Sequence, residues 1–350
     1  MIAALEGAGQ RPLSLAGDSG ETIVVLPHGG RVLGLYSAAS DQNFLWTSAA
    51  VSSAKLAREH FPSDRWFNSG GDRTWLAPEI DFFYPHYPDT SRQYFQPRQL
   101  DPGHYDAAAS DAQVILRNEL SMHSFRRGWN AQLRITKTIS VTSNPLARGA
   151  TAPLAARLQF AGYRLQTRLE MLHSDDDCCR VGLWNLLQLP GGGEMLVPVF
   201  HETEPVVYFG DIPAGDLCSD SRCVRYRMSA PGEQKIGIDA LAATGRAGYV
   251  LEDPVDRSRA TFVVRSFSVD ASGPYVDVPL HRPDAEGHAF QACNIDADYL
   301  GRFAELEYHA PAIGGKGAPR YGDDVSQVWA YRGSREAIAQ AAMELLGVTV

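Results

Sequence analysis

The sequence predicts an all-β protein built from large antiparallel sheets, with one helix at the C-terminal end. Three observations support this prediction. Short runs rich in apolar, β-branched and aromatic residues recur along the chain, several of them alternate apolar with polar residues, and no helical segments separate them as a parallel βαβ fold would require. The 350 residues show no internal repeat and no linker, so we expect one domain over residues 1–350.

The N-terminal part begins with a predicted hairpin. Residues 22–26 and 31–36 are short apolar runs joined by a Pro-His-Gly-Gly turn. Residues 52–59 predict a helical or irregular insertion. Residues 81–88 are rich in aromatic residues and proline, which excludes a regular helix and favours a long surface loop of the kind that builds pocket walls.

Strand signals then follow one another at short spacing. Residues 113–117, 132–141 and 164–170 alternate apolar with polar side chains, so each should bury one face. Residues 181–189 are more continuously apolar, as expected of a central strand. Further strands are predicted at residues 195–200, 235–238, 247–251, 261–267 and 303–308.

The one convincing helix is predicted over residues 334–346. Ser334 is a suitable N-cap, the segment is rich in alanine, and Gly347 is a suitable stop.

Composition restricts the class of partner. The formal net charge of -9, without a local cluster of Lys and Arg, argues against binding to nucleic acid or to an anionic membrane surface. No apolar run approaches the roughly 20 residues that span a bilayer. The first residues lack the basic and apolar regions of a signal peptide, so a cytoplasmic location is expected.

Five cysteines are an odd set in a chain long enough to fold without disulfides, so free thiols are expected. Cys218 and Cys223 have no matching second pair for a metal site. Residues 175–177 are three consecutive aspartates, which are more simply a solvated turn than a cation site. The sequence therefore predicts no metal site.

Residues 69–79 combine two glycines, two acids, an arginine and a tryptophan in one short segment. Glycines allow close approach of a ligand to the backbone, Arg73 offers a planar set of donors, and Trp75 offers a flat apolar face. These features fit a site for a polyhydroxylated ligand, with Asp72 and Glu79 as further candidates. The alternative is a turn in which Arg73 pairs with Asp72 or Glu79.

The order of these motifs resembles the galactose mutarotase-like (aldose epimerase) family. The early Gly-Gly-Arg strand, the Asn-Phe-Leu-Trp at residues 43–46, the Gly-Asp-Arg at 71–73, the Leu-Trp-Asn-Leu at 183–186 and the Ala-Glu-Leu-Glu at 304–307 stand in the order of that family's motifs. The form Gly-Gly-Asp-Arg-x-Trp-x-Ala-Pro-Glu is closer to uncharacterised mutarotase-like branches than to the epimerases. The resemblance implies a β-supersandwich fold and an activity that needs no cofactor.

The resemblance also implies roles for individual residues. In the family a glutamate removes the proton of the sugar hydroxyl and a histidine protonates the ring oxygen. Glu307 matches the glutamate, Arg73 matches the arginine that holds sugar hydroxyls, and Trp75 or Trp184 could stack on the ring. The histidine is missing, because Val181 stands at its position.

Other histidines are candidates for the missing acid. His86 lies in the aromatic segment that follows the arginine motif, and His201 follows a predicted strand. Glu305, Glu307 and His309 would form one row on a strand face, since residues two apart point the same way. The alternative for this row is an ordinary solvated strand face.

These residues support three hypotheses. The first is a carbohydrate-binding, mutarotase-like enzyme, an aldose epimerase with Glu307 as its base. The second is a noncatalytic carbohydrate-binding protein that has lost the acid. The third is an oligosaccharide hydrolase or lyase, which requires a second carboxylate, Glu79 or Glu305, within about 5 to 10 Å of Glu307.

Overall fold

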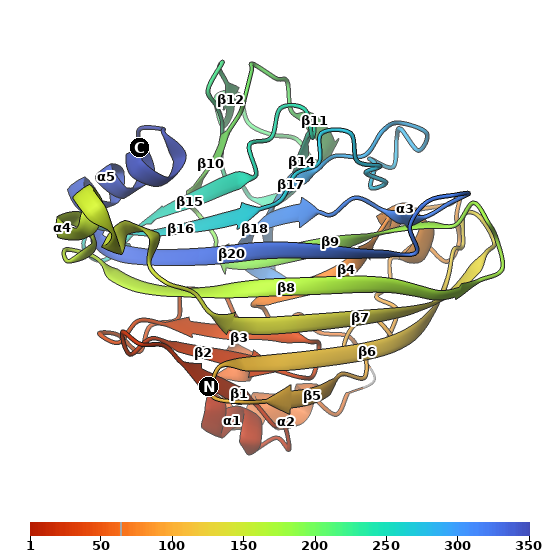
Figure 1. The fold of residues 1–350 in the computed structure, drawn as a ribbon, viewed down its shortest axis with the longest axis horizontal. Helices are drawn as coiled ribbons and strands as arrows, with labels where there is room; N and C mark the ends of the chain where they lie inside the picture. Colours follow the sequence, from red (N-terminus) through yellow and green to blue (C-terminus); the bar gives the residue numbers. More distant parts are fainter. Residues whose placement is uncertain (64) are drawn as a thin grey trace.

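The computed structural model describes residues 1–63 and 65–350, and these residues form two ten-stranded antiparallel sheets (Figure 1). In spatial order the first sheet contains β1 (Leu13–Ala16), β2 (Thr22–Leu26), β3 (Arg31–Tyr36), β4 (Asp72–Ala77), β9 (Arg180–Pro190), β18 (Gly301–His309), β17 (Phe290–Ala297), β14 (Gly232–Ile238) and β11 (Val206–Phe209), with β19 (Ile313–Gly314) paired to β9. The all-β prediction is confirmed.

The second sheet carries the longest strands. In spatial order it contains β12 (Leu217–Ser219), β13 (Cys223–Arg227), β10 (Glu194–Pro198), β15 (Arg246–Glu252), β16 (Arg259–Phe267), β20 (Tyr321–Ser334), β8 (Gln159–Ser174), β7 (Asn130–Val141), β6 (Gln113–His123) and β5 (Asp106–Ala109).

Helices are short except at the C-terminal end. The α-helices are α1 (Ile2–Glu6), α2 (Ala54–His60), α3 (Glu79–Phe82), α4 (Ala152–Ala155) and α5 (Arg335–Leu346), and the 3₁₀ turns are η1 (Ala49–Val51), η2 (Pro145–Ala147) and η3 (Gly149–Thr151). Helix α5 begins where the Ser334 hydroxyl accepts a hydrogen bond from the Ala337 amide, and it ends at Gly347, which has a left-handed φ of 69°. Both predicted ends of this helix are confirmed. Within the described part of the chain, no helix is long and apolar enough to cross a membrane.

The two sheets pack face to face around the largest apolar cluster. Leu187, Leu306 and Ile236 of the first sheet meet Leu165 and Val328 of the second in this cluster. Polar groups also join the sheets, because Asp72 on β4 accepts hydrogen bonds from Arg265 on β16 and from Tyr163 on β8. The core therefore lies between the sheets, and each sheet has a second, outer face.

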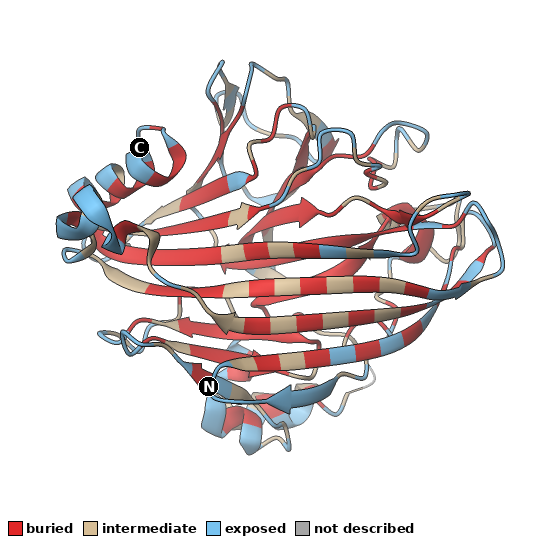
Figure 2. Ribbon diagram, viewed as in Figure 1, coloured by how far each residue is buried: buried red, intermediate tan, exposed pale blue. Residues whose placement is uncertain are grey.

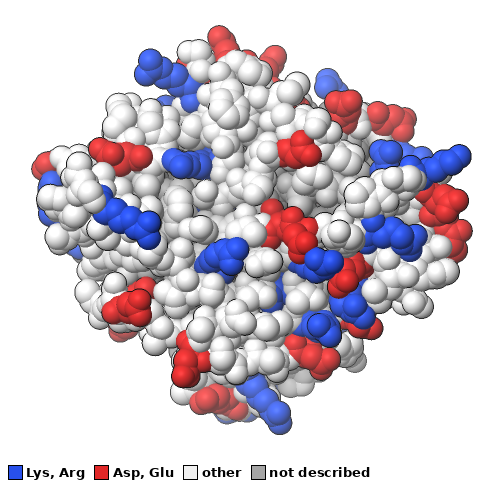
Figure 3. Space-filling view, in the orientation of Figure 1, with Lys and Arg blue, Asp and Glu red and all other residues white. Residues whose placement is uncertain are grey.

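The outer faces differ. Strands β6, β7 and β8 alternate buried with exposed or half-buried residues, as their sequences predict, so that face of the second sheet meets solvent (Figure 2). Acidic and basic side chains are mixed over the face seen in Figure 3, without a large area of one sign. In contrast, every residue of β4 and nearly every residue of β9 and β18 is buried. Loops therefore cover the outer face of the first sheet.

Two expectations about local structure need correction. The segment 81–88 is not a surface loop throughout, since helix α3 ends in it and Phe82 and Phe83 are fully buried against Trp129 and Trp75. The sequence-based predictions also did not include β17 and the 14-residue β20. Glycine and aspartate at the start of β20 weaken its local signal, but pairing with β8 on one side and β16 on the other outweighs this weakness.

Candidate functional site

The covered outer face of the first sheet carries a contiguous set of polar side chains, which we call the polar face. Successive residues of a strand point to opposite faces, so the register of five neighbouring strands brings these residues to the same side. Its members are Arg73 and Trp75 on β4, Trp184 and Gln188 on β9, Glu305, Glu307 and His309 on β18, Gln291 and Cys293 on β17, and Lys235 on β14.

At one end of the polar face, Arg73 pairs with Glu305. The Arg73 Nη2 to Glu305 Oε1 distance is 3.1 Å, and the Gln188 side-chain amide donates to the same oxygen at 2.9 Å. Arg73 also donates to Asn68 Oδ1 at 3.2 Å, and its guanidinium lies 4.2 Å from the centre of the Trp75 ring. Because Arg73 bonds Glu305 and Asn68, the alternative of a local pair with Asp72 or Glu79 does not describe this segment.

Glu307 lies at the centre of the polar face. Its Oε2 is 3.0 Å from Lys235 Nζ and accepts a hydrogen bond from Trp184 Nε1 at 2.6 Å. Burial raises the pKa of Glu307 to about 7, although the Lys235 ammonium acts in the opposite direction. The pKa of Lys235 is itself raised above its usual range, since the charges of Glu307, Glu79 and Asp277 outweigh the effect of burial. Glu307 can therefore exchange a proton near neutral pH beside a permanent cation.

His309 is close to Glu307 in sequence but does not face it across an open space. Its imidazole stacks on Trp184 with 5.7 Å between ring centres and 17° between ring planes. Only 1% of His309 is exposed, and burial lowers its pKa to about 3, so the ring is neutral. The row of Glu305, Glu307 and His309 is buried, and the alternative of a solvated strand face is wrong.

Glu79 belongs to the site but lies on helix α3 and not on a strand. It is the first residue of α3, separated from β4 by Pro78, and it is half-buried. Its carboxylate accepts a hydrogen bond from the Tyr94 hydroxyl at 2.8 Å, and its backbone amide donates to Asp277 Oδ1 at 2.6 Å. Burial raises the pKa of Glu79, with Lys235 opposing. The loops that hold Tyr94 and Asp277 thus form the cover of the polar face.

Three other predicted residues lie elsewhere. Asp72 points to the opposite side of β4 from Arg73 and is bound between the sheets by Arg265 and Tyr163. His86 is half-buried in the turn that follows α3. His201 is exposed beyond the end of β10, where its Nδ1 contacts the carbonyl oxygen of Glu202. The structure does not bring these three side chains to Glu307, and their roles stay predictions.

The glycines of the motif have a structural explanation. Gly70 and Gly71 have φ angles of 93° and 80°, a left-handed region that side chains disfavour. A Cβ atom on Gly70 would stand 2.4 Å from the carbonyl oxygen of Trp46, and one on Gly71 would stand 2.3 Å from that of Val32. The two glycines allow β4 to approach its neighbouring segments, so they place Arg73 rather than receive a ligand.

Several buried polar atoms of this region have no hydrogen-bond partner within the described residues. Two are donors, Arg73 Nε and Asn68 Nδ2, and two are acceptors, Gln188 Oε1 and Glu307 Oε1. Buried polar groups are nearly always paired, so unpaired donors and acceptors beside one another indicate a place for a ligand or water. Asn68 and Tyr94 also line an open pocket of about 700 Å³ with Trp66, Glu233 and Tyr299, which adjoins the polar face.

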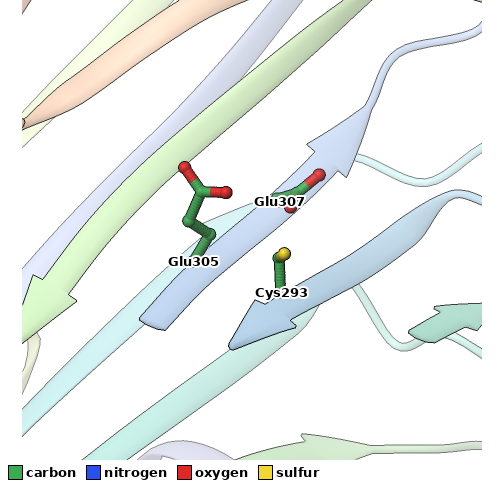
Figure 4. A group of neighbouring side chains, drawn as sticks. All are labelled: Cys293, Glu305 and Glu307. Atoms are coloured by element: carbon green, nitrogen blue, oxygen red, sulfur yellow. The ribbon is translucent and has the colours of Figure 1, made fainter. Parts of the chain in front are cut away.

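Cys293, Glu305 and Glu307 come close enough to be considered as metal ligands (Figure 4). One ligand atom from each lies within 4.8 Å of the others. However, Glu305 is already paired with Arg73 and Glu307 with Lys235, and burial raises the pKa of the Cys293 thiol well above its usual range. A metal ion would have to compete with two cations for two carboxylates and a protonated thiol, so this group suits ion pairing better than coordination.

Sequence reasoning missed Lys235, Gln188, Asp277 and Asn68 as members or supports of the site. Gln188 did leave a signal, because it is a polar residue with apolar neighbours on both sides, and Lys235 is the charged residue at the start of the predicted strand 235–238. Asp277 and Asn68 lie in loops, where no periodicity marks them.

Comparisons with known proteins agree with this fold. A family model described as "Family of unknown function (DUF6786)" matches residues 5–350. A putative aldose 1-epimerase from Escherichia coli K12 superposes with a TM-score of 0.52 at 11% identity, over 93% of this chain and 100% of that chain. The chain thus has the galactose mutarotase-like fold that the motifs predicted.

Two further structures give lower scores. A protein from Synechocystis has a TM-score of 0.49 at 13% identity, over 93% of this chain and 96% of that chain. A galactose mutarotase related enzyme from Lactobacillus acidophilus has a TM-score of 0.47 at 8% identity, over 91% and 97% of the two chains. No curated protein matches the sequence.

Proposed function

The chain belongs to the DUF6786 family, and we propose that it binds a carbohydrate on the polar face and uses Glu307 as a base for opening the sugar ring. One observation carries the binding proposal: unpartnered donors and acceptors lie together, buried, beside two tryptophan rings. A sugar hydroxyl both donates and accepts, so it suits a mixed set, whereas an anion needs donors alone. The buried rings of Trp75 and Trp184 hold the Arg73 guanidinium and the Lys235 ammonium at 4.2 and 4.3 Å from the ring centres, so they position two cationic donors beside this set.

The chemistry follows from the surroundings of Glu307. Its carboxylate takes the proton of the anomeric hydroxyl, the bond between C1 and the ring oxygen breaks, and the ring oxygen takes a proton from a water molecule, which leaves as hydroxide and is neutralised by the proton that Glu307 releases. Reclosure on the other face of the carbonyl reverses these transfers and gives the other anomer. The Lys235 ammonium stabilises negative charge as it develops on the sugar oxygens. A pKa of about 7 leaves a working fraction of Glu307 ionised at neutral pH.

The test measures anomer exchange with the purified protein. Freshly dissolved α-anomers of several aldoses are followed by polarimetry and by exchange NMR, and a single positioned base predicts an acceleration of about 10²–10⁴-fold over the uncatalysed rate. Glu307→Gln should remove the acceleration and keep binding. Arg73→Ala should weaken binding, while Arg168→Ala, at an exposed ion pair on the second sheet, is the matched control.

A second candidate function has its own observation. Val181 stands at the position of the family's histidine and packs in an apolar cluster, and His309 lies stacked on Trp184. A protein that binds sugar without turnover fits this lack of an acid. Calorimetric binding with no acceleration for any aldose would favour this candidate, and absence of binding to every sugar would reject carbohydrate binding altogether.

The hydrolase or lyase hypothesis is less well supported. Glu305 and Glu307 have carboxylate oxygens within 4.8 Å of one another, which is slightly closer than the about 5 to 10 Å that such a pair requires. Both side chains, however, project from one face of one strand, and Glu305 is bound by Arg73 and Gln188. Two carboxylates that cleave a glycosidic bond act from different sides of it.

A further inference from the structure

Next to Glu307 lies a second group of polar side chains, Glu79, Asp277, Gln291 and His309, which we call the acceptor cluster. Asp277 connects it, since Oδ1 accepts the Glu79 backbone amide at 2.6 Å and Oδ2 accepts the Gln291 side-chain amide at 2.8 Å. Gln291 on β17 lies directly opposite Glu307 on β18. The acceptor cluster is therefore continuous with the polar face.

Carboxyl groups outnumber basic side chains here. Four carboxyl groups, those of Glu79, Asp277, Glu305 and Glu307, share two basic side chains. Arg73 forms its ion pair with Glu305, and Lys235 forms its ion pair with Glu307. Among residues 1–63 and 65–350, no ion pair joins Glu79 or Asp277 to an arginine or a lysine. Asp277 is fully buried, so this lack of a cation is costly.

The same place holds buried acceptors without partners. Gln291 Oε1 is unpartnered, and so are both ring nitrogens of His309, of which one accepts and the other carries the N–H in the neutral ring; these residues are 0% and 1% exposed. His309 lies two residues beyond Glu307 on the same face of β18, and Gln291 lies opposite Glu307, so the imidazole and the Gln291 side chain share this face of the sheet. A carboxylate, an amide oxygen and a neutral imidazole nitrogen can all accept hydrogen bonds.

We propose that the acceptor cluster binds the protonated amine of an amino sugar, which rests on the proposed carbohydrate binding and narrows its substrate class. An ammonium group has three N–H donors and no acceptor. Its positive charge can pair with the carboxyl groups of Glu79 and Asp277, which form no ion pair with a described arginine or lysine. A neutral hydroxyl satisfies the hydrogen bonds but supplies no cation for the two additional carboxyl groups. The acceptor cluster therefore selects an amine over a hydroxyl at one position of the ring.

Aromatic rings and an opening support this assignment. The Lys235 ammonium lies 4.3 Å from the centre of the Trp184 ring and 5.5 Å from that of Tyr208, so these rings already face a cation. Glu79 is half-buried, and Tyr94, which donates to its carboxylate, lines the open pocket of about 700 Å³. A ligand can reach the acceptor cluster from this side.

The test is calorimetric titration of the whole protein with matched sugars. Each series contains a hexose, its 2-amino-2-deoxy analogue and the N-acetylated analogue, in the gluco, galacto and manno configurations. The N-acetyl compound keeps the nitrogen and removes its charge. We expect at least one amino sugar to bind about tenfold more tightly than both of its matched neutral sugars.

Glu79→Gln tests the residue assignment. The amide keeps the size of the side chain and an acceptor for Tyr94 but removes the charge, so the tenfold preference should fall to about twofold or less. Glu344→Gln, an exposed charge on α5, should leave the preference unchanged. Equal affinity for hexose and amino sugar in every series would overturn this inference and leave the proposed function standing. Failure of every sugar to bind would overturn both.

Discussion

Asp72→Asn should strongly destabilise the protein. Asp72 and Arg265 are both 0% exposed, and the two guanidinium nitrogens each bond one carboxylate oxygen at 3.1 Å. The Tyr163 hydroxyl donates to the same carboxylate at 2.6 Å. The amide cannot balance the charge of Arg265, and breaking a buried pair from one side costs about 3–5 kcal/mol. Urea unfolding followed by tryptophan fluorescence measures the decrease in the free energy of unfolding.

Matched variants separate this effect from a general sensitivity to charge removal. Asp323→Asn breaks the 2.8 Å pair with Arg168, whose side chains are 40% and 43% exposed, and should cost less than about 1 kcal/mol. Adding Arg265→Met to Asp72→Asn removes the uncompensated charge and should restore part of the stability. A loss below about 1 kcal/mol for Asp72→Asn alone would refute the reasoning.

Two further predictions concern proton binding and thiol access. Burial in the folded state raises the pKa of Glu307 to about 7, so the folded protein binds more protons than the unfolded chain between about pH 4.5 and 7. The free energy of unfolding should therefore fall as the pH rises through this window. Glu307→Gln should make this fall smaller. Denaturant midpoints at several pH values test this. Cys178 and Cys218 are exposed, whereas Cys179, Cys223 and Cys293 are buried, so a thiol reagent should titrate two groups in the native protein and five after unfolding.

Local pattern predicted much of the fold. The hairpin of β2 and β3, the alternating strands β6 and β7, the central strand β9 and the capped helix α5 all have strong local signals. Strand β20 did not, because its stability comes from two long partners that are distant in sequence. The helix α3 within an aromatic segment was missed for a similar reason, since burial of Phe82 and Phe83 holds it.

The site divides in the same way. Period-two spacing alone placed Glu305, Glu307 and His309 on one face, and the order of short motifs placed Arg73, Trp75 and Trp184 near them. No sequence pattern could show that Lys235 pairs with Glu307, that Arg73 pairs with Glu305, or that Asp72 points into the core.

The sequence by itself therefore determined the strand pattern, the C-terminal helix and the row of carboxylates, because these depend on spacing within one segment. Tertiary structure decided which partners surround each carboxylate. Lys235 and Glu307 are 72 residues apart, and Asp277 reaches Glu79 from a loop almost 200 residues further along the chain. Charge balance and burial arise only when such distant segments meet, and they give Glu307 and Glu79 the environment on which both proposals depend.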